Sequence, residues 1–435
     1  MLYLESFVHR VPLAEVVSRW IVNQPEPGDV AQLKRIVNFN SYIARIWVDG
    51  LARTVLAGIH GQAPRSMVAK TKGQLKDFIV DNPFDDSERT RELVARYRRY
   101  PEDFYRETPF DGRLYYIEQD VMPHKRYVGS TRIKRFRRIA EKGSRRIVDY
   151  MFERIRANAD ALAEERAKRL GIPKHELITP PAQQVEEFLH AERRLLKMIR
   201  RGSIQHEFPI LSIPDVVGIK IIADEKQYER IVETLQDHPS CTLIEQEHHT
   251  GRYNAINLRV AYKIPRDQLI ASTPNAHHRR VLSFRGFDPE TVAGEYRQFV
   301  ETAEDHVLLE IIVAGTSEFM ESEIGRSMHE DRIVQQRSHA SYSGHLATNV
   351  MYLMDYLLVS CLAPSRREVS DVPIKLWVKY MEDTMDRLKR ALFNVPVDAS
   401  FEEVDDPAQD KPAAPARLRS VTPPPSGETP LSAAE

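Results

Sequence analysis

Two short apolar runs rich in β-branched residues constrain the fold more than any other feature of the sequence. The run at 216–222 (VVGIKII) precedes a helical pattern that ends near Leu235, and the run at 307–313 (VLLEIIV) carries a single charge. Further strands are predicted at 114–121, 127–130, 242–246 and, from strict alternation of apolar and polar residues, 256–262. The strand–helix–strand order over 216–246 predicts a βαβ-like unit. Together these patterns predict an α+β fold with a mixed β-sheet flanked by helices.

Length and local composition divide the chain into three parts. The 435 residues exceed the usual size of one compact domain, and helical spacing predicts an N-terminal helical accessory region over 1–110. Residues 111–393 form the predicted main domain, with a helical insertion near 143–205 and C-terminal helices. Residues 394–435 are rich in Pro, Ala, Asp and Glu, which predicts a disordered tail. Within the main domain, helices are expected from Arg132 past Phe152 and over 183–201, 317–334, 346–362 and 374–393.

Composition excludes several classes of protein. A hydrophobic fraction of 42% and a net charge of −1 are ordinary for a globular chain, so net charge alone indicates no nucleic-acid partner. Cys241 and Cys361 are too far apart in sequence for a disulfide framework or a zinc motif, which favours a reduced, cytoplasmic location. The N-terminus lacks the features of a secretory signal. The apolar stretch 350–363 is too short to span a bilayer, so no membrane association is expected.

Two carboxylates lie in strand contexts. Asp215 directly precedes the first apolar run, and Glu310 lies inside the second. A carboxylate in an apolar strand is costly unless it is paired or binds a metal. Two such groups on neighbouring strands suit Mg²⁺, which takes one or two carboxylates together with phosphate oxygens and water. The alternative is that Asp215 caps a turn and Glu310 pairs with a surface arginine.

A basic segment (TRIKRFRRIAEK) supplies the opposite charge. Arg132, Lys134, Arg138 and Lys142 have helix-compatible spacing and are expected on one cationic face at the start of a helix. Because a helix N-terminus also carries partial positive charge, this face is a candidate polyphosphate site. A solvated basic face or an RNA-contacting stripe are the alternatives. The segment 250–257 (TGRYNAIN) joins two predicted strands and offers Tyr253 to stack on a base, unless it is an ordinary half-buried strand tyrosine.

In this order the segments resemble the RelA/SpoT-type nucleotide pyrophosphotransferases, the alarmone synthetases. That family carries R-x-K-x-x-x-S-x-x-x-K, D-x-x-G-x-R, G-Y-x-S-x-H and E-x-Q-x-R-T elements, which TRIKRFRRIAEK, DVVGIK, GRYNAIN and LEIIVAGT resemble over about two hundred residues. The resemblance implies a nucleotidyltransferase-like core. It also implies ATP binding by Arg132, Lys134, Arg138 and Lys142, with Mg²⁺ and catalysis at Asp215 and Glu310. Acceptor binding is implied for Tyr253, Asn257 and Lys220.

The implied activity is transfer of pyrophosphate from ATP to a ribose hydroxyl, with GDP, GTP, another nucleotide or a tRNA end as acceptor. The chain departs from the family patterns: Arg138 replaces the serine, Lys220 the arginine and Asn257 the histidine. These changes leave open a catalytically inactive nucleotide sensor or an RNA-binding protein on the same fold. A second register for the donor site, through Arg193, Arg194, Lys197 and Arg201, lies nearer to Asp215 in sequence. The oligomeric state is left undetermined.

Overall fold

The computed structural model describes residues 2–119, 124–203, 209–251, 254–272, 279–280, 283, 288–325, 327–338, 344–361, 373–381 and 383–392. The predicted tail 394–435 and Tyr253 lie outside these residues. The strands are β1 (Leu2–Leu4), β2 (Arg65–Thr71), β3 (Pro109–Gln119), β4 (His124–Ile133), β5 (Leu211–Ile213), β6 (Val217–Ile222), β7 (Cys241–His249), β8 (Ala255–Lys263) and β9 (His306–Ala314).

The helices precede and surround the sheet. Those before β6 are α1 (Arg10–Ile21), α2 (Asp29–His60), α3 (Lys72–Asp81), α4 (Glu88–Arg99), α5 (Phe136–Leu170) and α6 (Pro181–Arg200). Those after it are α7 (Glu225–Asp237), α8 (Arg266–Ala271), α10 (Pro289–Glu301), α11 (Thr316–Met320), α12 (Met328–Ser338), α13 (His345–Ser360) and α14 (Thr384–Leu392). A π-helical turn, Glu321–Gly325, follows α11. The fold is α+β, as predicted.

Seven strands form one mixed sheet in the order β2-β3-β4-β6-β9-β8-β7. Among the described strands of this sheet, only β6 and β9 pair in parallel, with Gly218 opposite Glu310. The expected strand–helix–strand order over β6, α7 and β7 is present, and β7 runs parallel to β6 in the same sheet. The two strands are not neighbours, because β9 and β8 lie between them and β7 forms the far edge. Most side chains of β7 are exposed, whereas β9 alternates buried apolar residues along its length. The more apolar strand therefore takes the central position beside β6.

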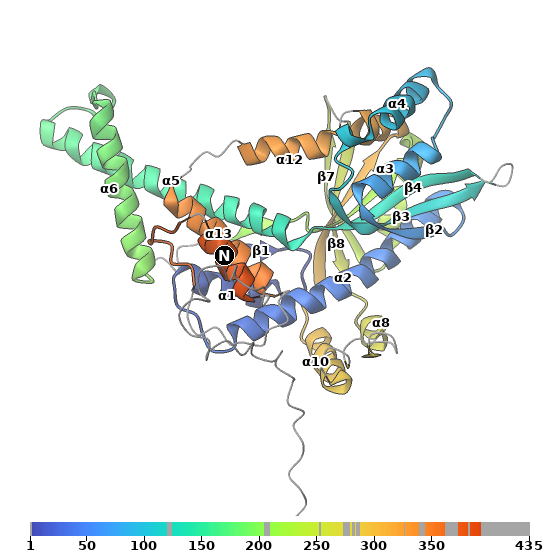
Figure 1. Ribbon diagram of the computed structural model, residues 1–435, viewed down its shortest axis with the longest axis horizontal. Coiled ribbons are helices and arrows are strands. Elements are labelled where there is room, and N and C mark those ends of the chain that lie inside the picture. Colours follow the sequence, from blue (N-terminus) through green and yellow to red (C-terminus); the bar gives the residue numbers. More distant parts are fainter. Residues whose placement is uncertain are drawn as a thin grey trace, which may run out of the picture.

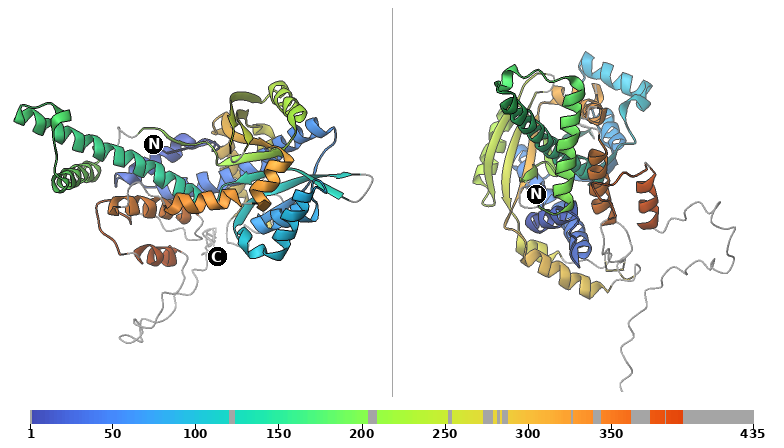
Figure 2. Two further views of the ribbon diagram at one scale, coloured as in Figure 1. Left: turned by 90° about the horizontal axis from the view of Figure 1, so that it is seen from above. Right: turned by 90° about the vertical axis from the view of Figure 1, so that its left-hand side faces the viewer.

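Helix α2 covers one face of the sheet. It packs against β4 and β6, and its buried Trp47, Leu51 and Val55 join Ile219 and Ile221 of β6 in one core. On the opposite face, α3, α4 and α11 form a second core, in which Tyr127 of β4 stacks on Phe319 at a centroid distance of 5.0 Å. The sheet thus separates two packed layers (Figures 1 and 2).

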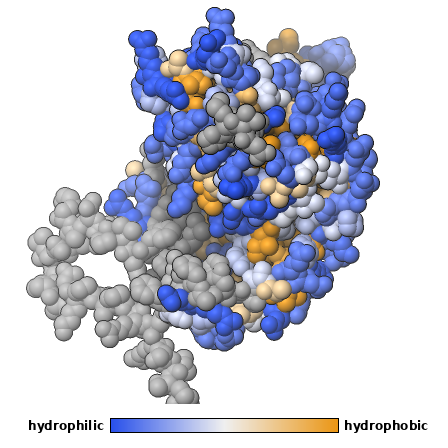
Figure 3. All heavy atoms as spheres, turned by 90° about the vertical axis from the view of Figure 1, so that its right-hand side faces the viewer, coloured by the Kyte–Doolittle hydropathy of each residue, from blue (hydrophilic) through white to orange (hydrophobic). Residues whose placement is uncertain are grey.

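The segment 1–110 contributes directly to the sheet. Strand β2 pairs antiparallel with β3, and the expected boundary after Phe110 falls inside β3. Figure 1 shows α5 and α6 extending from the sheet as a helical arm, within the region expected to hold a helical insertion. The end of the molecule with the β3–β4 hairpin is largely hydrophilic, with small separate apolar patches (Figure 3). Within the described ranges no helix combines the length and apolar content needed to cross a bilayer.

Three expected helices differ from the structure. Arg132 belongs to β4, because it pairs with Gly218 of β6, and α5 begins only at Phe136. The expected helix over 317–334 is interrupted by the π-helical turn and by Ser327, whose φ is +45°. The helix expected over 374–393 begins at Thr384. Asn349 donates to the carbonyls of three residues between 375 and 378, which keeps those carbonyls out of a helical ladder.

Candidate functional site

A cavity of about 990 Å³ opens beside the centre of the sheet. Its walls come from the end of β4 and the loop after it, the first turns of α5, the segment before β6, strands β8 and β9, and α12. Seven of the nine site residues predicted from sequence line it: Arg132, Lys134, Arg138, Lys142, Asp215, Asn257 and Glu310. Segments almost two hundred residues apart in sequence therefore meet at one place.

Asp215 is held by two lysines. Lys134 lies 2.5 Å from its Oδ2 atom, and Lys142 pairs with the same oxygen. Burial alone would raise the pKa of Asp215, but Lys134 and Lys142 outweigh it and hold this pKa well below the usual carboxyl range. Its Oδ1 atom is buried and accepts no hydrogen bond from any described residue. Asp215 is thus ionised, with one oxygen left to accept a ligand.

Glu310 lines the same cavity from β9, where it is opposite Gly218 of β6. It occupies the half-buried face of β9 together with Leu308 and Ile312. Asn257 of β8 donates from Nδ2 to Glu310 Oε1 over 2.7 Å, while Asn257 Oδ1 is buried and without a hydrogen-bond partner among the described residues. The amide therefore orients the carboxylate and adds a carbonyl oxygen to the same wall.

The oxygens of Asp215, Asn257 and Glu310 suit Mg²⁺ only if a bound phosphate ligand supplies further oxygens. Asp215 Oδ1, Asn257 Oδ1 and Glu310 are the hard donors that Mg²⁺ prefers. In the part of the chain that the structure describes, no group of three or more His, Cys, Asp or Glu could hold a metal by itself. Lys134 and Lys142 also oppose a bare dication at Asp215. The residues therefore suit a metal that arrives with phosphate oxygens and water in its coordination sphere.

Arg132 is the centre of a cationic cluster. Among the described residues its guanidinium makes no hydrogen bond or ion pair, and it lines the cavity. After burial, its charge is a further cause of the lowered pKa of Lys134 and Lys220. It also opposes the rise in the pKa of Lys72, which Glu323 and Glu330 produce against the effect of burial. Such an uncompensated guanidinium among other cations is a strong attractor for a polyphosphate.

Two of the predicted site residues, Lys220 and Arg138, contribute less directly to the charge of the cavity. Lys220 lies under the cavity in an adjacent space of about 50 Å³. Its Nζ atom is 3.4 Å from Glu323 and 5.0 Å from the Phe319 ring centroid. Burial lowers the pKa of Lys220 to about 8, an effect that Glu323 partly offsets. Arg138 pairs with Glu141 at 2.9 Å on α5, so its charge is already partly neutralised.

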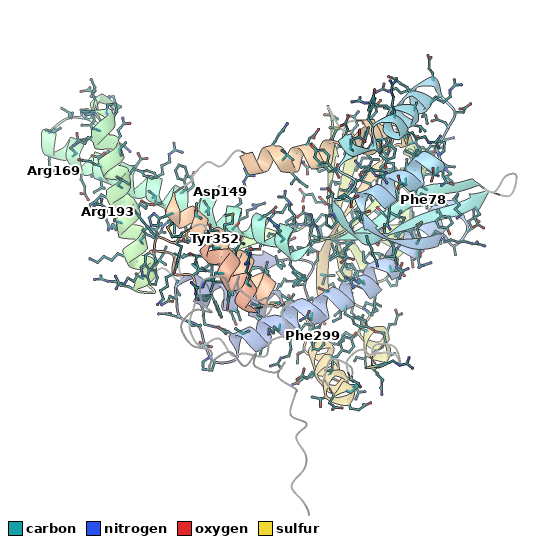
Figure 4. All side chains as sticks on the ribbon, in the orientation of Figure 1. Phe78, Asp149, Arg169, Arg193, Phe299 and Tyr352 are labelled. Atoms are coloured by element: carbon teal, nitrogen blue, oxygen red, sulfur yellow. The ribbon has the colours of Figure 1, made fainter. Side chains whose placement is uncertain are left out.

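The alternative set of candidate ATP-binding residues on α6 does not line this cavity. Arg193, Arg194 and Lys197 lie on α6, and none of them lines the cavity. Figure 4 places Arg193 on the helical arm, away from the sheet. Of the two registers, only Arg132, Lys134 and Lys142 lie together with Asp215.

Sequence reasoning missed a group of buried charges beneath the cavity. Lys72 begins α3, and its Nζ atom lies 2.7 Å from Glu323 and 3.3 Å from Glu330. Lys72 lines both the main cavity and the smaller one. No local pattern distinguishes it from an ordinary lysine after the Thr71 helix cap, because its partners are some 250 residues away in sequence.

Neither kind of comparison with known proteins finds a relative, since no protein-family model and no curated protein matches the chain. The placement of the site residues therefore carries the functional argument.

Binding of a polyphosphate should weaken as the pH rises through the range above 7. Burial and Arg132 lower the pKa of Lys134 to about 7, against the opposing effect of Asp215. An anion beside Lys134 raises this pKa, so binding takes up a proton. The affinity should fall by up to about tenfold per pH unit between about pH 7.5 and about pH 9.

This pH dependence can be measured by calorimetric titration with inorganic tripolyphosphate. The control is Lys134→Arg, which stays charged throughout the range. Lys220 titrates in both proteins, so only the contribution of Lys134 differs between them. Equal slopes in the two proteins would show that Lys134 does not gain a proton on binding.

Proposed function

We propose that this chain is a Mg²⁺-dependent pyrophosphotransferase with a nucleotidyltransferase-like core, which uses ATP as the donor. The observation that carries the proposal is the convergence on one cavity of Asp215, Glu310 and Arg132, an arginine without an ion pair among the described residues. Cations alone would suit many anions. Two carboxylates that line the same cavity favour a phosphate ligand that brings a divalent metal.

In the proposed reaction a ribose hydroxyl of the acceptor attacks the β-phosphorus of ATP. The new O–Pβ bond forms as the bond between Pβ and the oxygen bridging to Pα breaks, and AMP leaves with that oxygen. Glu310 accepts the hydroxyl proton, while Arg132, Lys134 and Lys142 hold and neutralise the phosphates. Mg²⁺, held by Asp215 and Glu310, supplies further neutralisation of the phosphate charge when it is bound.

The acceptor is a nucleotide, GDP, GTP or another, or the 3′ end of a tRNA. Asn257 lines the cavity and Lys220 lies just beneath it, and Tyr253 is proposed to stack on the acceptor base. Four further arginines on the wall formed by the β4–α5 loop and α5 favour a phosphate-rich acceptor such as a polynucleotide end. They are Arg135, Arg137, Arg145 and Arg146.

The reaction can be tested by tracing both ends of the donor. The protein is incubated with Mg²⁺, a panel of nucleotides and tRNA, and ATP labelled at either the α or the γ position. Pyrophosphate transfer places the γ label on the acceptor and converts the α label to AMP. A γ-labelled acceptor together with α-labelled ADP would indicate a kinase instead. If neither label moves with any acceptor, the proposed activity is wrong.

One observation favours a second function, a nucleotide sensor without turnover. Lys134 and Lys142 both occupy Asp215 Oδ2, and two ammonium groups at this carboxylate compete with a dication. A sensor would bind ATP with an affinity that Mg²⁺ does not improve, and it would move neither label. Improvement of ATP affinity by Mg²⁺ would favour the enzyme.

A further inference from the structure

Two buried carboxylates lie in the segment that follows β9. Glu323 in the π-helical turn is 2% exposed, and Glu330 in α12 is 5% exposed. Both pair with Lys72, whose Nζ atom lies 2.7 Å from Glu323 and 3.3 Å from Glu330. Glu323 also lies 3.4 Å from Lys220, and Glu330 lies 3.9 Å from Lys76. Three buried lysines therefore share these two carboxylates, and Lys72 contacts both of them.

Glu330 is only partly satisfied in this position. Its Oε2 atom is buried and accepts no hydrogen bond from any described residue, and Lys76 Nζ is 3.9 Å away. Lys76 instead donates to the Phe104 carbonyl and to Ser327 Oγ, both at 2.9 Å. A buried carboxylate oxygen with no donor is costly. The contact between Glu330 and Lys72 is therefore one that a better anion can replace.

Helix α12 is attached to the body mainly at its first turn. It begins directly after Ser327, whose φ of +45° is unusual for a residue with a side chain, and it packs on the π-helical turn. From Asp331 to Gln335 its residues are largely exposed; Val334, for example, is 50% exposed. Figure 1 shows α12 extending from the sheet toward the α5–α6 arm. Arg332, Ile333 and Val334 nevertheless line the same cavity as Arg132.

We propose that Glu330 occupies Lys72 in the ligand-free protein and that a polyphosphate displaces it. Lys72 then becomes a further phosphate-binding residue, contributed by α3, beside Arg132 in the same cavity. Loss of the Glu330 contact frees the first turn of α12, which forms one wall of the cavity. Glu330 thus acts as an internal competitor of the ligand. The inference rests on the proposed function only for the chemical class of the ligand.

The test uses inorganic tripolyphosphate without metal, so that it does not depend on catalysis. Glu330→Gln removes the competing charge and should tighten binding by about tenfold, the order expected for one charged contact. The matched control is Asp331→Asn. Asp331 is the next residue of α12, is exposed and accepts a hydrogen bond from the Tyr105 hydroxyl. This control should leave the affinity unchanged.

A double mutant identifies the cation. In a Lys72→Met background, Glu330→Gln should no longer increase the affinity for tripolyphosphate, because the lysine that Glu330 occupies is absent. If Lys72→Met does not fold, the proposal is tested by comparing the tripolyphosphate affinities of Glu330→Gln and Asp331→Asn. Hydrogen exchange of the α12 amides should also become faster when tripolyphosphate binds to the wild type.

Unchanged or weaker binding by Glu330→Gln would overturn the proposal, since a purely structural ion pair gives that result. Absence of tripolyphosphate binding in every variant would overturn it too. Tight tripolyphosphate binding without movement of label from ATP would instead contradict the proposed function and leave the role of Glu330 standing.

Discussion

Glu310→Gln should reduce pyrophosphate transfer by about 10²–10³-fold, the cost of removing one charged group from a preorganised site. The substitution removes both the proton acceptor and one of the two proposed metal ligands. Its glutamine carbonyl still accepts the hydrogen bond from Asn257 Nδ2. The free energy of unfolding should therefore change by no more than about 1 kcal/mol. Initial rates of γ-label transfer and thermal unfolding measure the two effects.

Glu245→Gln is the control for this prediction. Glu245 is an exposed carboxylate on β7 that does not line the cavity, so its loss should change neither rate nor stability. Near-normal transfer by Glu310→Gln would remove the two-carboxylate site from consideration. Asp215→Asn is a less clean test, because it also leaves Lys134 and Lys142 without their shared counter-charge.

The central strands could be predicted from sequence because their pattern is local. The runs at 216–222 and 307–313 became β6 and β9 with small changes at their ends. Alternation in β8 placed Leu258 and Val260 in the core as expected. The prediction that Glu310 lies on a strand beside the first apolar run is confirmed by the parallel pairing of β6 with β9, whereas Asp215 lies in the turn directly before β6 and not on the strand. Their catalytic and metal-binding roles stay predictions.

The start of α5 could not be placed from spacing alone. Arg132 and Lys134 fit a helical repeat with Arg138 and Lys142, but β6 needs a partner on the side away from β9. The end of β4 supplies it through the pairing of Arg132 with Gly218. Tertiary strand pairing therefore outweighed the local helical pattern. The cationic group still meets at one cavity, although a strand end, a loop and a helix now provide it.

The buried charges beneath the cavity could not be predicted from the sequence. Lys72 and Glu323 are 251 residues apart, and nothing near either one marks it as buried. Long charged side chains are usually exposed, so sequence alone places both at the surface. Only the packing of α3 against the turn after α11 brings them together.

Arg132→Met should weaken ATP binding by about 10- to 100-fold, the range for loss of one or two charge-assisted hydrogen bonds. Arg132 lines the cavity and has no ion pair with any described residue, so its charge is available to a ligand. Methionine keeps much of the side-chain volume and breaks no salt bridge recorded among these residues. The fold should therefore be retained.

The most direct test of the nucleotide site is a calorimetric titration of ATP and Mg²⁺ into wild type, Arg132→Met and Lys197→Ala. Lys197 is an exposed cation on α6, outside the cavity, and it belongs to the alternative donor register. The site described above predicts saturable binding in the wild type and in Lys197→Ala, with a large loss in Arg132→Met. Equal affinity in the wild type and Arg132→Met, with weaker binding by Lys197→Ala, would contradict it and place the nucleotide on the helical arm.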